Sequence, residues 1–577
     1  MISRARIAWL VLVACFGLAA AAGVVLARTP FAAIRGYLDA RAGDGSADRY
    51  TPALHLRLQV AFAVCGLAAG GAAVGLAVGR KRLVGVLGPA WRGGVTDGVR
   101  LLRRWRAAGR RMGLAVLAVT LLGGVLRAAY LNQPMRFDES YTYLAYASQP
   151  WYVALSRYDA PNNHVFHSLL VVATTRLFGE APWAIRLPAC LAGVLVVPAT
   201  MLLARRVANR GAALLAGLIV ATSSPLIEYS TNARGYMLVC LATLVAWLAA
   251  IELARRPNRA AAAVLAASIV AGCWSVPIML YAASMLVVWM LAQRGTPVGA
   301  VPAAAGTLVV YAPVLIVEGP GALLASGMSA GMSWRAWISG ASGWTRETGA
   351  LLLRDVPWPA VIAAVLAMGV AVGDAERAVR RRWWTAALSI LVPVGIVAAQ
   401  RVVPPGRVWL FLLPLAAVLV GTGLSRLLGR LHNAGVRRMG LVAAGVLLAA
   451  WPLVNLVRND SIQSSVETGA LPDAEPIVAD LGGLLREGEF VLTVSPSSAP
   501  LVYYARRRGL DVRHFDRPGP ADLPSRGGVV VVHRHQPQTP DTVLQELGFD
   551  PASVAGRVVL LKEYPSARVY RIVGHSQ

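Results

Sequence analysis

Two adjacent carboxylates, Asp138 and Glu139, lie between an apolar segment and an aromatic loop, in the stretch RFDESYTYLAYA over 136–147. An ionisable side chain in a membrane segment costs about 2.5 to 3.5 kcal/mol on insertion scales, so carboxylates beside a span mark a candidate functional site. Asp138 also precedes a helix expected over 139–149, which Pro150 would end, and its side chain would serve as the N-cap. The tyrosines of the loop would then form an interfacial belt that needs no substrate. From the residues alone, both interpretations stay open.

Further polar residues are expected near the membrane boundary on the same side as Asp138. They are Arg157, Asp159, Asn162, Asn163, His164, His167, Arg186, Glu228, Asn232, Arg234, Arg401 and Arg407. Carboxylates gathered with arginines suit a reaction between a hydroxyl or amine acceptor and a donor with a phosphate leaving group. A carboxylate can accept the acceptor's proton, and an arginine can stabilise charge on the leaving oxygen. Because neighbours on a helix point about 100° apart, we expect Asp138 to be the base and Glu139 to orient or assist.

Several of these residues also have a purely structural interpretation. His164 and His167 have a spacing that suits metal ligands, but without a third ligand in a fixed motif they are more simply interfacial or substrate-contacting histidines, and no metal site is predicted. The turn IEYSTNARGYM, which contains Arg234, would equally cap two helix ends. Arg407 would equally snorkel at the end of a span.

The composition indicates a multi-pass membrane protein. The 577 residues are 56% hydrophobic with a mean hydropathy of +0.56, and apolar segments recur along the chain. The formal charge of +27 falls in short blocks between these segments, which is a topology signal and not a nucleic-acid surface. The five cysteines lie in apolar stretches without CxxC spacing, which predicts neither disulfides nor a zinc site.

The apolar segments predict a polytopic α-helical membrane protein. About thirteen spans are expected, at 7–27, 58–78, 112–131, 184–204, 211–228, 235–252, 260–273, 274–292, 298–316, 357–373, 384–400, 407–425 and 440–457. If they alternate, the Arg-rich loops all fall on the inner side, beginning with 80–111. This requires the apolar stretch 163–178 to be an interfacial or re-entrant helix. The N-terminus is then expected in the cytoplasm, with 7–27 a signal anchor or a cleavable signal peptide, and Asp138 outside the plasma membrane.

The chain divides into three parts. Two spans and a basic cytoplasmic loop occupy 1–111, a membrane catalytic core occupies 112–457, and a small extracytoplasmic α/β domain occupies 458–577. In the last part, helices are expected at 473–486, 499–508 and 541–547, and strands at 490–494, 512–515, 528–533 and 558–561 with a hairpin partner at 568–572. Alternating strands and helices predict a mostly parallel sheet. No GxGxxG or P-loop is present, so no nucleotide is assigned.

Motifs in a set order carry a resemblance to a known family. FDESYTY, FGEAPWAIRLPACLAGVLVVPATMLLARRV, SPLIEYSTNARGYML and PPGRVWLFLLPLAAVL resemble the GT-C superfamily of glycosyltransferases, in the branch with protein O-mannosyltransferases and aminoarabinose transferases. The resemblance implies an inverting transfer of a sugar from a polyprenyl-phosphate carrier to a lipid, glycan or protein acceptor on the outer face. It implies that Asp138 is the catalytic carboxylate, with Glu139 the second member of the motif, and that Arg234 and Arg407 lie near the carrier phosphate or the sugar.

Other residues are assigned to substrate binding. Tyr141 and the aromatic loop are expected to shape the sugar site, and Asn163, His164 and Arg186 to contact substrate. The His-Pro-Pro that is familiar after the first loop of the family is absent, and Asn162-Asn163-His164 occupies its place. The expected partners are a polyprenyl-phosphate-linked sugar and membrane lipids. No cofactor is assigned, and a divalent metal stays open.

Two functions of other classes compete with this reading. A secondary transporter would place its ionisable residues near the bilayer midplane on broken helices, whereas those singled out here lie at the predicted outer ends of spans. A non-catalytic membrane scaffold would bind a partner through the C-terminal domain, and it would leave the acids and arginines of the outer face unexplained.

Overall fold

The structure is a computed structural model that describes residues 4–40, 50–79, 96–99, 103, 110–293, 299–324, 331–373, 376–463, 469–486, 488–519 and 522–574. Within these ranges, nine helices are long and apolar enough to cross a membrane, or ten if a bent pair counts as one span. The protein is therefore a multi-pass membrane protein. The basic stretch predicted on the inner side, over 80–111, lies mostly outside the described residues.

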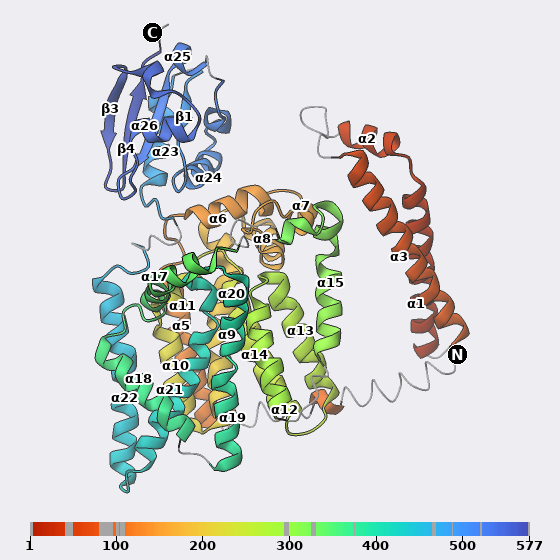
Figure 1. The fold of residues 1–577 in the computed structure, drawn as a ribbon, viewed down its shortest axis with the longest axis vertical. Coiled ribbons are helices and arrows are strands. Elements are labelled where there is room, and N and C mark those ends of the chain that lie inside the picture. The colour runs from red at the N-terminus through yellow and green to blue at the C-terminus, as the bar shows by residue number, and fades with distance from the viewer. Residues whose placement is uncertain are drawn as a thin grey trace.

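The first two spans form a helical pair beside the main bundle (Figure 1). Helices α1 (Arg4–Arg28) and α3 (Pro52–Val78) are joined through α2 (Phe31–Asp39) and pack closely against each other. Their backbones meet at Gly23 and Gly66, where a Cβ on Gly23 would lie 2.7 Å from the Cα of Gly66. Only glycine allows so close an approach.

A bundle of helices forms the main body. Its members are α5 (Arg110–Ala129), α9 (Pro182–Val207), α10 (Arg210–Thr222), α11 (Ser224–Ser230), α12 (Tyr236–Leu253), α13 (Arg259–Ser275), α14 (Met279–Ala292), α15 (Ala300–Val317), α18 (Trp358–Gly373), α19 (Arg377–Leu388), α20 (Leu391–Gln400), α21 (Leu412–Gly429) and α22 (Ala434–Arg458). Helices α9 and α12 lie at its centre and carry the largest buried share of the candidate spans. Most of their residues are buried against neighbouring helices, which is why both read as continuous apolar runs.

The predicted spans coincide with α1, α3 and the bundle helices, with local differences. The range predicted as one span at 211–228 is the pair α10 and α11, bent by 60°. Pro225, in the first turn of α11, has no N–H to donate and interrupts the helical hydrogen bonds there. Helices α13, α14 and α18 are apolar but shorter than a full span, so the count of thirteen stays a prediction.

Short helices cover the end of the bundle that faces the C-terminal domain (Figure 1). They are α6 (Phe137–Thr142), the π-helix η1 (Tyr143–Ala147), α7 (Trp151–Ser156), α8 (Val165–Phe178), α16 (Gly321–Leu324), α17 (Trp334–Leu352) and the 3-10 turn η2 (Gly406–Trp409). The expectation that Asp138 caps a helix over 139–149 is wrong. The helix begins two residues earlier, because the side chain of Glu139 accepts the backbone N–H of Arg136 at 2.9 Å and so closes the first turn.

The C-terminal domain is a four-stranded sheet flanked by short helices. It contains α23 (Ala474–Leu484), β1 (Phe490–Leu492), α24 (Ser498–Arg508), η4 (Val512–Phe515), α25 (Asp522–Arg526), β2 (Gly528–His533), α26 (Pro540–Glu546), η5 (Pro551–Val554), β3 (Val558–Glu563) and β4 (Ala567–Ile572). The strand order is β1-β2-β4-β3. Phe490 of β1 pairs with Gly528 of β2.

Two expectations for this domain are wrong. The strand pairing is not mostly parallel, because only β1 and β2 pair in parallel. Strand β4 forms a hairpin with β3, lies between β2 and β3, and runs antiparallel to both. The segment Val512–Phe515 is a 3-10 turn and not a strand. Its side chain cap, Asp511, accepts the backbone N–H of Arg513 at 3.0 Å, which turns the chain. The predicted hairpin of β3 and β4 is confirmed.

Candidate active site

A buried ion pair fixes the loop that carries the two adjacent carboxylates. Arg186, near the start of α9, donates from Nε to Glu139 at 2.9 Å and also pairs with it through Nη2. Neither side chain has any exposed surface. The remaining donors of Arg186 bind three backbone carbonyls of the loop, those of Leu131, Gln133 and Pro134. All five N–H groups of Arg186 are thus directed to the protein, which makes it a clamp on the loop.

The ionised form of Glu139 is held in place from several directions. Burial alone would raise the pKa of this carboxyl, but the charges of Arg186 and Arg136 and the backbone N–H of Ala233 outweigh burial and hold the pKa below its usual value. Ala233 donates at 2.9 Å from the turn that follows α11. Glu139 therefore joins α6, α9 and that turn, and it stays a carboxylate at neutral pH.

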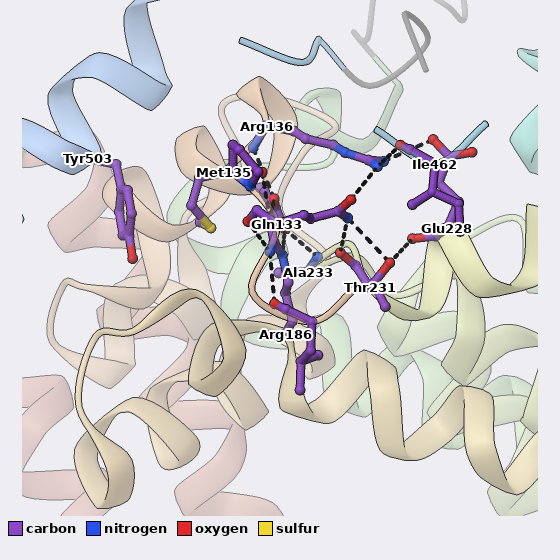
Figure 2. A network of polar contacts seen from close by, with 12 residues as sticks. Gln133, Met135, Arg136, Arg186, Glu228, Thr231, Ala233, Ile462 and Tyr503 are labelled. Atoms are coloured by element: carbon purple, nitrogen blue, oxygen red, sulfur yellow. Dashed lines mark hydrogen bonds and ion pairs between the residues drawn. The ribbon is translucent and has the colours of Figure 1, made fainter. Parts of the chain in front are cut away.

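A second network ties the same loop to the C-terminal domain (Figure 2). Arg136 donates from Nη1 to Glu228 at 2.9 Å, and both side chains are buried. The other carboxylate oxygen of Glu228 pairs with Arg354, which also donates to the carbonyl of Ser461 at 3.0 Å. Arg136 reaches the carbonyl of Ile462 through Nη2. One carboxylate thus pairs with two arginines and joins α11, the end of α17 and the segment after α22.

The C-terminal domain adds backbone contacts to this loop. The backbone N–H of Phe137 donates to the carbonyl of Gly469 at 2.9 Å, and that of Met135 donates to the hydroxyl of Tyr504 at 3.1 Å. Gly469 has a φ of +68°, and a Cβ there would lie 2.8 Å from the Cβ of Phe137, so this contact needs glycine. The position of α6 therefore depends on the C-terminal domain.

Asp138 lies beside the two arginines that the sequence motifs had singled out. Its Oδ2 is 3.9 Å from Nη2 of Arg234 and 3.9 Å from Nη2 of Arg407. The Asp138 and Arg407 side chains are each 17% exposed, whereas Arg234 is nearly buried. The structure thus brings together three residues from α6, the turn before α12 and η2. The two arginines leave one carboxylate in an environment of net positive charge.

Arg234 is held by side chains from α6 and from the loop before α8. It donates from Nη2 to the side chain of Asn162 at 3.1 Å and from Nη1 to the hydroxyl of Thr142 at 3.3 Å. Its buried Nε has no hydrogen-bond partner within the described ranges. Thr142 was not among the candidate residues predicted from the sequence, and Asn162 was a candidate polar residue but was not assigned to substrate binding. The sequence does not indicate which of the adjacent residues Asn162 and Asn163 binds Arg234.

Arg407 is positioned through the aromatic residues around η2. Its Nε donates to the hydroxyl of Tyr236 at 3.1 Å. The preceding loop is held by α17, since the indole of Trp344 donates to the carbonyl of Pro404 at 2.7 Å. Trp409 stacks on Tyr281 of α14, with ring centroids 5.9 Å apart. Tyr236 was also missed by sequence reasoning, although it lies two positions after Arg234 in NARGYM.

His164 is a buried neutral imidazole that lies against Gly235 and Tyr236, next to Arg234. Its Nδ1 accepts the backbone N–H of Gly235 at 2.7 Å, which leaves the ring proton on Nε2, and its ring packs edge-on against Tyr236. Burial, and then the nearby charge of Arg234, lowers the pKa of His164 well below its usual value. Both ring nitrogens of the buried His167, one turn further on, have no partner within the described ranges.

The titration of His164 predicts a pH dependence of stability. Below the unfolded pKa of about 6.5, the unfolded chain binds a proton that the folded ring does not, so the free energy of unfolding falls as the pH falls. His164→Asn keeps an acceptor for the Gly235 N–H but does not titrate. Between pH of about 7.5 and 5, its Tm in detergent is expected to fall less than that of the wild type. His432→Asn, at an exposed histidine, is the control. Equal pH slopes for His164→Asn and the wild type would refute this role.

Three predicted substrate-binding residues make their contacts with groups other than Asp138. The amide of Asn163 is buried and used within its own loop, where it donates to the carbonyl of Ala154 at 3.0 Å and accepts from Ser168 at 2.8 Å. Tyr141 is half-buried in an aromatic cluster and stacks on Phe137 with ring centroids 6.1 Å apart. Arg186, described above, binds the loop and not the space beside Asp138.

Metal-binding side chains do not gather in the described ranges: no three of the histidine, cysteine, aspartate and glutamate residues found there could hold a metal ion together. The five cysteines are free thiols. The groups near Asp138 that could contact a ligand include guanidinium, hydroxyl, amide and imidazole groups. This set suits an anion with a polar, uncharged neighbour, such as a phosphate attached to a sugar.

Comparison with known proteins identifies the architecture. Residues 159–317 match the family described as dolichyl-phosphate-mannose-protein mannosyltransferase. The whole fold is similar to the apo structure of ArnT from Cupriavidus metallidurans, with a TM-score of 0.54 and 16% identity over 80% of this chain and 97% of that one. The chain has the GT-C glycosyltransferase fold.

Other GT-C structures also match. They include ArnT from Cupriavidus metallidurans bound to undecaprenyl phosphate (TM-score 0.43, 16% identity, 81% of this chain and 99% of that one). Another is the oligosaccharyltransferase AglB from Archaeoglobus fulgidus in complex with an inhibitory peptide and a dolichol-phosphate (TM-score 0.45, 12% identity, 68% and 63%). No curated protein has a significant sequence match. The resemblance to GT-C enzymes of the mannosyltransferase and ArnT branch is confirmed.

Proposed function

We propose that the protein transfers a sugar from a polyprenyl-phosphate carrier to an acceptor on the outer face of the membrane, with inversion at the anomeric carbon and with Asp138 as the base. The observation that carries the proposal is the position of the Asp138 carboxylate, 3.9 Å from each of two guanidinium groups. A base beside two cations suits a reaction in which a proton is removed on one side of a bond and negative charge develops on the other.

The proposed step balances as a single displacement. The acceptor oxygen or nitrogen attacks the anomeric carbon while Asp138 takes its proton. The bond between that carbon and the phosphate oxygen breaks, and the electron pair leaves with the phosphate. Arg234 and Arg407 then stabilise the added negative charge on the polyprenyl phosphate. Single displacement inverts the anomeric configuration.

The carrier is argued from the family match and the charge of the site. The description of the matching family names a dolichyl-phosphate sugar, and the match covers His164 and Arg234. The unpartnered Nε of Arg234 offers a further donor. Buried polar atoms in Asn232 and His167 have no partner among the residues that the structure describes, and they suit the hydroxyl groups of a sugar. We assign Glu139 and Arg186 to holding the loop, and Asp138, Arg234, Arg407 and His164 to the substrates.

Removing one arginine is expected to weaken carrier binding. Arg407→Gln should raise the Kd for a polyprenyl phosphate about 10- to 100-fold, because a hydrogen bond to a charged group contributes roughly 1.5 to 3 kcal/mol. The Kd can be measured by titration in detergent. Arg401→Gln, in the same loop, removes an equal charge without an ion pair to Asp138 and should leave the Kd within about threefold of the wild type. Equal effects of the two variants would refute the phosphate contact of Arg407.

The function is tested with the purified protein in detergent. A panel of polyprenyl-phosphate sugars is incubated with a membrane-lipid and glycan extract, and labelled product and released polyprenyl phosphate are both followed. The proposal predicts that product and released carrier appear in equal amounts for at least one donor, with the anomeric configuration inverted. Absence of both transfer and carrier binding across the panel would refute it, and retention of configuration would refute the single displacement.

A further inference from the structure

A cavity lies at the end of the bundle opposite Asp138. It has a volume of about 450 Å³ and is lined by residues of α9, α12, α14, α18, α19 and α21. Arg206, which lines it, lies twenty residues after Arg186 on α9, so the cavity mouth is roughly 30 Å along the helix from the candidate active site. Figure 1 shows α19 and the ends of α12 and α14 at the end of the bundle away from the C-terminal sheet.

The walls of this cavity are apolar and its charged residues are all arginines. Trp247, Trp289 and Trp383 line it together with aliphatic side chains, and the charged lining residues are Arg206, Arg255 and Arg382. Its volume lies in the range of ligand pockets, roughly 300 to 1,000 Å³. An apolar chamber with cations at one end matches an amphiphile with an apolar chain and an anionic head group.

The cations at the cavity exceed the nearby carboxylates. Glu252 accepts from Arg206 at 2.6 Å and from Arg256 at 3.0 Å, so one carboxylate is shared by two arginines. Arg255 and Arg382 are both exposed. The side chain of Arg382 has no carboxylate partner within the described ranges. The mouth therefore keeps a net positive charge that can attract a phosphate.

The cavity walls are fixed by hydrogen bonds between α14 and α19. The indole of Trp289 donates to the carbonyl of Arg382 at 3.2 Å, and Gln293 donates to the hydroxyl of Thr385 at 2.8 Å. Such a preformed apolar space would be strongly destabilising if empty, and its walls offer water few partners. In a membrane, the available filling is a lipid chain from the leaflet at that end.

We propose that this cavity binds an anionic glycerophospholipid, with an acyl chain against the three tryptophans and the phosphate at Arg206, Arg255 and Arg382. Charge complementarity selects the occupant, because a zwitterionic lipid would bring its own cation to a mouth already rich in arginine. The location of α19 supports this, since its sequence RAVRRRWWTAAL places arginines next to tryptophans as at a membrane interface. The site is separate from the proposed sugar transfer and does not depend on it.

The test is lipid titration of the delipidated full-length protein in detergent, followed by native mass spectrometry. Phosphatidylglycerol is expected to bind at least about tenfold more tightly than phosphatidylcholine with the same acyl chains. Arg255→Gln with Arg382→Gln should weaken phosphatidylglycerol binding about tenfold, whereas the matched pair Arg437→Gln with Arg438→Gln should change it less than about twofold. Ala387→Trp, which fills the cavity from α19, should weaken the binding of both lipids.

Three outcomes would overturn the proposal. They are equal affinity for the two lipids, equal effects of the two arginine pairs, and displacement of phosphatidylglycerol from the cavity by a polyprenyl phosphate at equal concentration. The arginine variants decide the result even if Ala387→Trp fails to fold. Asp138→Asn should bind phosphatidylglycerol as the wild type does, so a failure of the proposed sugar transfer leaves this test intact.

Discussion

Arg186→Met is expected to lower the free energy of unfolding by about 3 to 5 kcal/mol, because it leaves the carboxylate of Glu139 buried without its main partner. Both side chains are fully buried, and Arg186 also binds three carbonyls that would lose their donors. The free energy can be measured by denaturation in mixed micelles. Glu139→Gln in the same chain should recover part of the loss, because a neutral amide costs less to bury than an unpaired carboxylate.

An exposed pair supplies the control. Arg508 and Glu475 lie 3.0 Å apart with side chains 45% and 42% exposed. Arg508→Met should therefore change the free energy of unfolding by less than about 1 kcal/mol. If Arg186→Met were no more destabilising than Arg508→Met, the buried pair would not fix the loop, and the positioning role of Glu139 and Arg186 would be wrong.

The sequence predicts the grouping of Asp138, Arg234 and Arg407 because of how membrane topology works. Apolar spans alternate in direction, so the residues that follow or precede every second boundary must share one face. The motifs then select one carboxylate and two arginines from that face, and the structure places these three within ion-pair distance. The predicted topology places the candidate residues on one face of the membrane, and the sequence motifs then indicate which residues of that face form the site.

The hydrogen-bond and ion-pair partners of individual side chains could not be derived from the sequence in the same way. Arg186 and Glu139 look like substrate contacts in a sequence, but packing directs every donor of Arg186 to the loop. Asn162 and Asn163 are indistinguishable by type, and only the turn of the backbone directs Asn162 to Arg234. Arg136 was overlooked because its carboxylate partner, Glu228, lies on α11, 92 positions away in the sequence. Such contacts depend on tertiary packing, which has no local sequence pattern.

In the C-terminal domain, local sequence patterns predicted most of the strands but not how they pair. Apolar β-branched residues identified β2 and the hairpin, but the pairing of strands depends on their order in the sheet, and β4 lies between β2 and β3 and runs antiparallel to both. The short segment at Val512–Phe515 has strand-like residues, yet the side chain of Asp511 turns it. In both cases one connection or one side-chain hydrogen bond overrides the propensity of the segment.

Asp138→Asn is expected to lower the rate constant of sugar transfer by about 10²- to 10⁴-fold, the usual contribution of a general base. The amide has the shape of the carboxylate but cannot take the acceptor's proton. The loop should stay in place, because Glu139 and Arg186 hold it and Asp138 has no part in their contacts. Binding of the carrier should be equal or tighter, since a negative charge beside the phosphate is removed.

Asp159→Asn is the matched control for this variant. Asp159 lies in the same outer loop region and binds Tyr146 at 2.7 Å and Arg157 at 2.7 Å, away from Arg234 and Arg407. The Asp159→Asn variant removes one carboxylate but leaves the proposed base, Asp138, intact. Its transfer rate is expected to stay within about threefold of the wild type.

The most direct measurement of the central claim is single-turnover transfer from a pre-bound, labelled polyprenyl-phosphate sugar in the wild type, Asp138→Asn and Asp159→Asn. We expect bound donor in all three proteins, rapid transfer in the wild type and Asp159→Asn, and a rate at least about 100-fold lower in Asp138→Asn. Transfer at the wild-type rate by folded, donor-bound Asp138→Asn would contradict the account, because the reaction would then need no base at this position.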